Sequence, residues 1–163
     1  MTDELSHLDH RGQLRMVDVS GKPVTTRRAV AEGRVRISAR LAAMIQDRSL
    51  PKGDLFSTVR LAGIAAAKRT SDLIPLCHNL VLNHIELEAR VEANEVVLRA
   101  TVIADGKTGV EMEALTAVSV SALTVVDMGK SIDRSMVIGP IRLIEKTGGT
   151  HGPYSAPEQG NAT

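Results

Sequence analysis

The sequence predicts an α+β fold in which an antiparallel β-sheet carries helices on one face. The expected elements follow the order strand, helix, helix, hairpin, helix, strand. Apolar and polar residues alternate from Ile85 to Val91, as in a half-buried strand. The roughly twenty residues before Gly129 contain no turn signal and are too many for one strand, so they predict a helix.

Both ends of the chain are expected to be loosely attached to one domain that comprises residues 1–163. Residues 1–33 combine glycines, a proline and charges with little apolar sequence, which is typical of a mobile or partner-dependent arm. Within it, about 1–15 is expected to be flexible. The glycine-rich, polar residues 147–163 predict a flexible tail. Between these ends, the first element is a short alternating strand at Arg34–Ile37.

Two helices follow this strand. Ser38 is placed to cap a helix over about residues 39–48, which Pro51 prevents from continuing. Asp54 is a second candidate cap, because apolar residues at helical spacing follow it as far as Ala66. The next segment is interpreted as an apolar loop.

The second half of the chain predicts a β-hairpin and the long helix. Residues 85–91 and 96–104 are the two strands of the hairpin. Thr108 and Glu111 have the spacing of a capping box, which would open a helix that reaches Gly129. This helix is apolar nearly all round, so we expect it to be buried on several sides, with another subunit as one candidate cover.

Residues 136–146 predict the last strand, with a bulge or kink at Gly139–Pro140. The complete order is that of a ferredoxin-like split βαβ fold with one extra helix. This fold serves many functions, so the function has to be argued from individual side chains.

Composition excludes two classes of function. Twenty Lys and Arg residues against nineteen Asp and Glu give a net charge of +1, so no overall field attracts nucleic acid or an anionic membrane. One Tyr, one Phe and no Trp provide no platform for stacking bases.

No leader pattern or stretch of about 18 uncharged apolar residues is found. We expect a cytoplasmic protein, and a single cysteine, Cys77, fits a reducing compartment.

Asp127 and Lys130 lie three residues apart at the end of the long helix. A carboxylate at that end opposes the helix dipole at a cost of about 0.3–1 kcal/mol, whereas a lysine is favoured there. One interpretation is a surface ion pair of little value. The other is a carboxylate retained for chemistry.

Cys77 and His78 end the apolar loop. A Cys–His dyad would need their side chains to converge, whereas adjacent side chains usually diverge, so Cys77 is better interpreted as a small apolar filler. His78 is suited to act as a neutral donor, acceptor or proton carrier. His84 is one further candidate ligand, but the other histidines lie in the end segments, so we expect no dedicated zinc site.

Glu113 and several bases at element ends complete the candidates. Glu111 is assigned to the capping box, whereas Glu113 has no such structural role. Lys52 and Gly53 precede a helix, where a cation beside exposed N–H groups suits a phosphate, although they match no nucleotide-binding fingerprint. The other bases of this kind are Arg27, Arg28, Lys68, Arg69, Lys107, Lys130 and Lys146.

Five blocks of this sequence closely resemble one enzyme family. They are Lys52–Asp54, Ala62–Thr70, Asp72–His78, Lys107–Thr116 and Asp127–Lys130. The sequence is similar, roughly from Leu5 to Tyr154, to the cyclic pyranopterin monophosphate synthases, the C proteins of molybdenum cofactor biosynthesis. This resemblance implies a ferredoxin-like subunit in a homohexamer, a trimer of dimers with active sites at the dimer interface.

The resemblance also implies a reaction and a site. The cyclic nucleotide (8S)-3′,8-cyclo-7,8-dihydroguanosine 5′-triphosphate would be converted to cyclic pyranopterin monophosphate with release of diphosphate. The residues expected to be catalytic are Asp127, Lys130, Lys52 and His78. Those expected to contact substrate are Leu76, Cys77, His78, Met112, Glu113, Lys68 and Arg27. No resident cofactor or metal is expected, and Mg²⁺ is considered only as a companion of the phosphates.

A non-catalytic ferredoxin-like module that binds a nucleotide or oligomerises is the alternative. Asp127 argues against it, because this carboxylate does not help its helix and would repel a phosphate.

Overall fold

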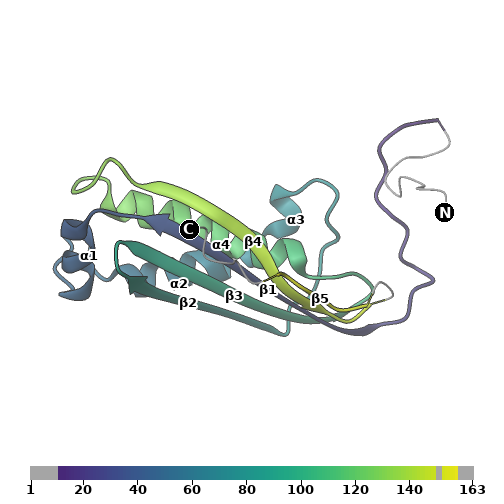
Figure 1. Ribbon diagram of the computed structural model, residues 1–163. Coiled ribbons are helices and arrows are strands. Elements are labelled where there is room, and N and C mark those ends of the chain that lie inside the picture. Colours follow the sequence, from purple (N-terminus) through teal and green to yellow (C-terminus); the bar gives the residue numbers. More distant parts are fainter. Residues whose placement is uncertain (1–10, 150–151, 158–163) are drawn as a thin grey trace.

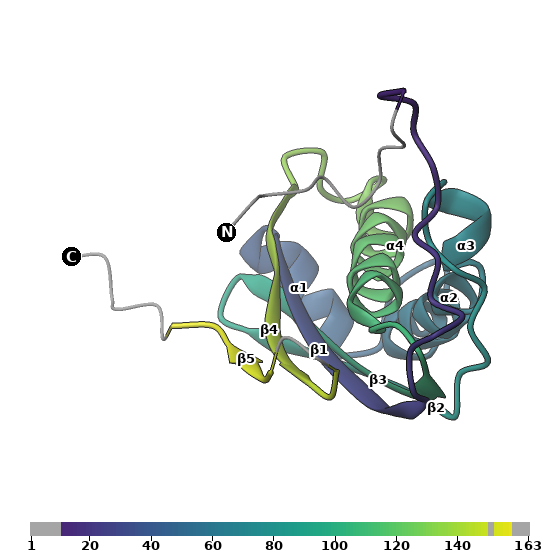
Figure 2. The same cartoon turned by 90° about the vertical axis from the view of Figure 1, so that its right-hand side faces the viewer.

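The computed structural model describes residues 11–149 and 152–157. Five strands form an antiparallel sheet in the order β2-β3-β1-β4-β5, and helices cover one of its faces (Figures 1 and 2). The strands are β1 (Thr25–Arg36), β2 (His84–Glu92), β3 (Glu95–Gly106), β4 (Val137–Thr147) and β5 (Tyr154–Ser155). The helices are α1 (Ala39–Gln46), α2 (Leu55–Ala67), α3 (Thr70–Leu73) and α4 (Glu111–Gly129). The predicted α+β, ferredoxin-like arrangement is confirmed.

The central strand β1 begins at Thr25, so the interpretation of residues 25–33 as part of an arm is wrong. Ala29, Val30 and Ala31 are fully buried there. This part of the strand was not predicted because its buried residues are mainly small alanines beside arginines, which do not form an alternating pattern of large apolar residues. Of the predicted flexible ends, residues 1–10, 150–151 and 158–163 lie outside the described residues, and the flexibility of the rest stays a prediction.

α4 packs against the sheet and is buried over much of its surface, as the sequence predicted. Its alanines Ala114, Ala117 and Ala122 are fully buried. A Cβ atom added to Gly33 of β1 would lie 2.4 Å from the side chain of Val118, so this glycine lets strand and helix approach closely. By length and composition α4 could cross a membrane, but 56% of that window is buried inside the protein, as in a core helix.

The predicted capping box of α4 is wrong. Val110 is the N-cap residue, and no side chain caps the helix. The Glu111 carboxylate instead lies 3.0 Å from Nζ of Lys146 on β4. The other two predicted caps are confirmed, since Ser38 accepts from the backbone of α1 and Asp54 from that of α2.

The short helix α3 and the short strand β5 were not predicted, whereas the irregularity in β4 was predicted. α3 occupies part of the segment between α2 and the hairpin. β5 pairs with β4 only through Glu145 and Lys146. The β1–β4 register shifts opposite Gly139–Pro140, which confirms the predicted bulge.

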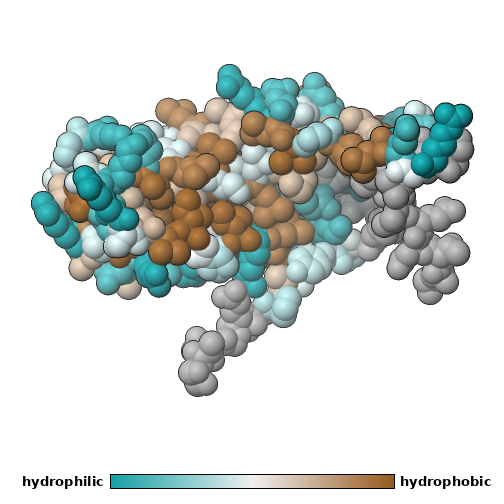
Figure 3. All heavy atoms as spheres, turned by 90° about the horizontal axis from the view of Figure 1, so that it is seen from above, coloured by the Kyte–Doolittle hydropathy of each residue, from teal (hydrophilic) through white to brown (hydrophobic). Residues whose placement is uncertain are grey.

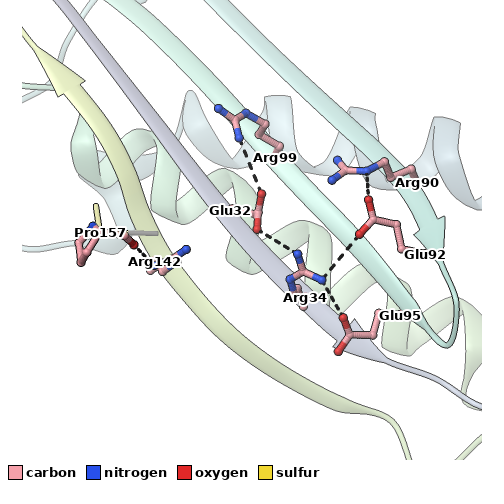
Figure 4. A network of polar contacts seen from close by, with 8 residues as sticks. All are labelled: Glu32, Arg34, Arg90, Glu92, Glu95, Arg99, Arg142 and Pro157. Atoms are coloured by element: carbon pink, nitrogen blue, oxygen red, sulfur yellow. Dashed lines mark hydrogen bonds and ion pairs between the residues drawn. The ribbon is translucent and has the colours of Figure 1, made fainter. Parts of the chain in front are cut away.

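The sheet face opposite the helices is covered by a network of charges (Figure 4). Arg34 lies 2.9 Å from Glu95 and within 4 Å of Glu32 and Glu92. Val30 is on this face, two residues from Glu32, and is nevertheless fully buried. Long charged side chains therefore shield this face from water, and the predicted site residues have to be sought on the helical side.

Candidate active site

The predicted site residues form two groups at opposite ends of α4. The helix has 19 residues, which at about 1.5 Å per residue separates its ends by about 27 Å. The C-terminal group lies on the side of α1 and contains Lys52, Asp127 and Lys130 (Figure 1). The N-terminal group lies on the side of α3 and contains Leu76, Cys77, His78, Met112, Glu113, Lys68 and Arg27. Within one chain, the structure does not bring the two groups together.

In the C-terminal group, the Asp127 carboxylate sits between two lysines. Nζ of Lys130 lies 2.7 Å from one carboxylate oxygen, and Nζ of Lys52 lies 2.9 Å from the other. Lys52 also donates to the backbone carbonyl of Asp127 at 2.7 Å, a helix-end acceptor without an intrahelical partner. Lys130 and then Lys52 lower the pKa of Asp127 to about 2. The carboxylate is therefore ionised, and the interpretation as a simple pair with Lys130 is incomplete.

Lys52 does not act with the N–H groups of α2 as the sequence suggested. The Asp54 carboxylate already accepts from the backbone N–H groups of Phe56 and Ser57, at 3.2 and 3.3 Å. Gly53 has φ +94°, a value that favours glycine, in the turn between Lys52 and the helix. Asp54 therefore occupies two of the N–H groups that the sequence offered to a phosphate, and Lys52 lies beside Asp127 instead. The role of Lys52 in phosphate binding stays a prediction.

In the N-terminal group, Glu113 is buried beside Cys77. Glu113 is only 3% exposed, and burial, with the charge of Glu111, raises its pKa. Burial and the nearby Glu113 raise the pKa of the Cys77 thiol. A raised pKa disfavours the thiolate that a nucleophile requires, so the interpretation of Cys77 as a filler is favoured. Met112 is 37% exposed in the first turn of α4.

His78 completes this group through a contact with the segment that precedes β1. Its Nε2 lies 2.9 Å from the backbone carbonyl oxygen of Val17. Within residues 11–149 and 152–157, no group of three or more His, Cys, Asp or Glu side chains is arranged to hold a metal ion.

A basic cavity of about 220 Å³ lies at the same end of α4. Its lining contains one carboxylate, that of Glu111, and five basic residues: Lys22, Arg27, Arg28, Lys107 and Lys146. Several cations around one small space suit a ligand with several negative charges, such as a polyphosphate.

Glycines create the space in this cavity. Gly148 and Gly149 have φ +87° and +89°, and a Cβ atom at Gly149 would lie 1.9 Å from a terminal nitrogen of Arg27. A larger residue would therefore displace the arginine from the cavity wall. Sequence reasoning missed Lys22 and the role of Gly148–Gly149, because a glycine pair near the end of a chain is typical of a flexible tail.

Comparisons with known proteins identify the family of this chain. A sequence model of the MoaC family matches residues 16–149. A cyclic pyranopterin monophosphate synthase of Parvibaculum lavamentivorans is 54% identical over 94% of this chain and 97% of its own length. Enzymes of the same name from Streptomyces avermitilis and a Roseiflexus species are 53% and 54% identical, over 94% and 93% of this chain and 90% and 97% of their own lengths. The matched region contains every predicted site residue. The chain belongs to the MoaC family.

Proposed function

We propose that this chain converts (8S)-3′,8-cyclo-7,8-dihydroguanosine 5′-triphosphate to cyclic pyranopterin monophosphate and releases diphosphate, a step of molybdenum cofactor biosynthesis. Its family and the names of relatives above 50% identity support an enzyme that acts on this small molecule. One structural observation carries the proposal: a cavity with five bases lies at the end of α4 that also holds His78 and the buried Glu113. The non-catalytic alternative is not favoured.

The basic cavity would hold the triphosphate. Its lysines and arginines offset the negative charge and stabilise the diphosphate as it leaves. The purine end needs groups that accept and donate protons while its ring opens and closes again. His78 and Glu113 serve that end. The ionised Asp127, together with Lys130 and Lys52, provides a second set of groups that can accept or donate protons.

The two groups would act together when they come from two copies of the chain. About 27 Å separates the ends of α4, which is too far for one nucleotide to contact both groups in one chain. If two copies pack with their α4 helices antiparallel across a two-fold axis, the Asp127 end of one helix lies beside the Met112 end of the other. The axis would pass near Ser119, midway between these ends.

The surface of α4 supports this packing. Met112, Leu115, Ser119, Leu123 and Asp127 recur at a spacing of three or four residues, so they lie along one side of the helix. None of the five is buried, and Leu123 is 59% exposed. The site residues Met112 and Asp127 stand at the two ends of this row.

The neighbouring strand extends this surface. Figure 3 shows apolar residues gathered across the face of the molecule that contains α4 and β4. The edge of β4 before Glu145 has no partner strand within the described residues, although apolar edges are usually covered. A second copy of the chain would cover both this strand edge and the apolar side of α4. We propose this dimer as the unit that forms the site, in the hexamer of three dimers that the family resemblance implies.

The proposed chemistry needs no resident metal, because the five bases of the cavity supply positive charge, and Mg²⁺ enters only with the phosphates. The unpaired Cys77 supports a cytoplasmic location.

Incubating the purified chain with the cyclic triphosphate tests this function. We expect one diphosphate per molecule of pterin product, identified by its mass, and turnover within a few-fold of normal after EDTA treatment. A chain that binds the triphosphate without releasing diphosphate would be a binding module, and the proposal would be wrong.

A further inference from the structure

The segment Met16–Lys22, called the strap here, crosses the N-terminal group of the site. Figure 2 shows the chain before β1 passing α3 and the near end of α4 before it enters the sheet. The Val17 carbonyl accepts a hydrogen bond from His78, and the Ser20 carbonyl accepts one from Nζ of Lys107 at 2.7 Å. Lys22 lines the basic cavity. The strap therefore contacts both His78 and the cavity.

Local hydrogen bonds give the strap its shape. The Asp18 carboxylate accepts from the backbone N–H of Ser20 at 2.8 Å, and the N–H of Lys22 donates to the Val19 carbonyl at 3.0 Å. The hydrogen bonds from Ser20, with Lys107 nearby, lower the pKa of Asp18. Only Val17 and Val19 are half-buried, and the other five residues of the strap are exposed. A segment held by so few contacts can open at low cost.

The contact between the strap and His78 bears on which ring nitrogen carries hydrogen. A backbone carbonyl can only accept a hydrogen bond, so the Nε2 that lies 2.9 Å from the Val17 oxygen must be protonated. In the neutral ring, Nδ1 then has no hydrogen and can accept a proton. Two backbone carbonyls, those of Val17 and Ser20, would thus orient a histidine and a lysine of the site.

We propose that the strap closes over the bound substrate and holds His78 as the Nε2–H tautomer, so that Nδ1 is the atom that accepts a proton from the substrate. A proton transferred to Nδ1 gives an imidazolium whose Nε2–H still donates to Val17, and the proton later returns to product or water. The substrate in this statement rests on the proposed function. The tautomer of His78 and its dependence on the strap do not rest on the proposed function.

The tautomer is measured by long-range proton–nitrogen NMR correlation on the ¹⁵N-labelled full chain, at alkaline pH where imidazole rings are neutral. The His78 signals are identified as those missing from the His78→Gln variant. We expect a protonated Nε2 and an unprotonated Nδ1. A protonated Nδ1, or an even mixture of both forms, would overturn the inference.

The dependence on the strap is tested with Asp18→Ala, which removes the acceptor for the Ser20 N–H. We expect faster amide hydrogen exchange in the strap, a mixed tautomer at His78 and several-fold lower turnover. Asp47→Ala, a change at an exposed aspartate beyond α1, should change none of the three. If exchange stays slow in Asp18→Ala, the double variant Val17→Gly/Val19→Gly removes the half-buried side chains and makes the same comparison.

A loosened strap with an unchanged His78 tautomer would refute the positioning role. If the unmodified chain releases no diphosphate, the proposed function fails while the NMR result still decides this inference.

Discussion

Replacing Asp127 with asparagine removes one negative charge and almost no volume. The variant loses the charge that lies 2.7 Å from Lys130 and 2.9 Å from Lys52. It keeps the bond from Lys52 to the backbone carbonyl of residue 127. Because the side chain is 58% exposed, the fold should be unaffected. Turnover should fall by about 100-fold or more if the carboxylate transfers a proton or positions a group that does.

The depressed pKa predicts how stability depends on pH. The pKa of Asp127 is about 2 in the folded chain, against an ordinary value of 3.8. A lowered pKa stabilises the fold above the ordinary pKa, and this stabilisation is lost as the pH falls toward 2. The variant lacks it, so its melting temperature should lie slightly below that of the unmodified chain at pH 7, and the difference should shrink below pH 4. Solvent and salt keep the effect small.

The helix dipole alone would predict the opposite sign, because asparagine carries no charge to oppose it. Two lysines within 3 Å of the carboxylate outweigh the dipole at this position. At pH 7 a pKa of about 2 leaves the Asp127 carboxyl ionised. Asp127 of the free chain is therefore suited to accept a proton or a hydrogen bond rather than to donate one.

Both quantities can be measured on one purified variant, by diphosphate release at saturating substrate and by thermal unfolding at pH 7 and pH 3. Turnover within a few-fold of normal would show that Asp127 is not catalytic. A difference in melting temperature that persists unchanged at pH 3 would show that the two ion pairs do not cause it.

Three further changes test other parts of the site. Lys52→Ala should reduce turnover by about 100-fold with little change in melting temperature. It should also raise the pKa of Asp127, measured by carboxyl NMR titration, and an unchanged pKa would contradict the 2.9 Å contact between the two side chains. Gly149→Ala should raise KM by about tenfold by displacing the cavity arginine; a normal KM would separate the cavity from substrate binding. Leu123→Glu should weaken self-association, measured by sedimentation, by at least about 100-fold, because the dimer would bury an unpaired charge. The control Leu61→Glu on α2 should leave the dimer intact, and equal behaviour of the two variants would argue against the α4 interface.

Elements with strong local signals could be predicted from the sequence. α4 reaches Gly129 as predicted, because a long apolar run without an internal turn signal has few other solutions, although it begins at Glu111 and not at a Thr108 cap. The caps Ser38 and Asp54 were found because their chemistry is local. β1 was largely missed because its burial comes from its central place in the sheet, which only long-range pairing decides.

The site was predicted as a set of residues but not as an arrangement. Thr108 and Glu111 match a capping box, yet Lys146 on β4 takes the Glu111 carboxylate instead. Lys52 was assigned to the nearest helix start, whereas its partner is Asp127, 75 residues later in the chain. Neither contact has a signal in local spacing, because each depends on how the sheet brings distant segments together.

Subunit complementation tests most directly whether two copies form each site. Chains carrying Asp127→Asn and chains carrying His78→Gln are each expected to be nearly inactive alone. In randomly mixed assemblies, a site is intact when its C-terminal group comes from a His78→Gln chain and its N-terminal group from an Asp127→Asn chain. Each condition holds for half of the sites, so about a quarter of normal turnover should return. Turnover no higher than the sum of the two separate variants would contradict the shared site.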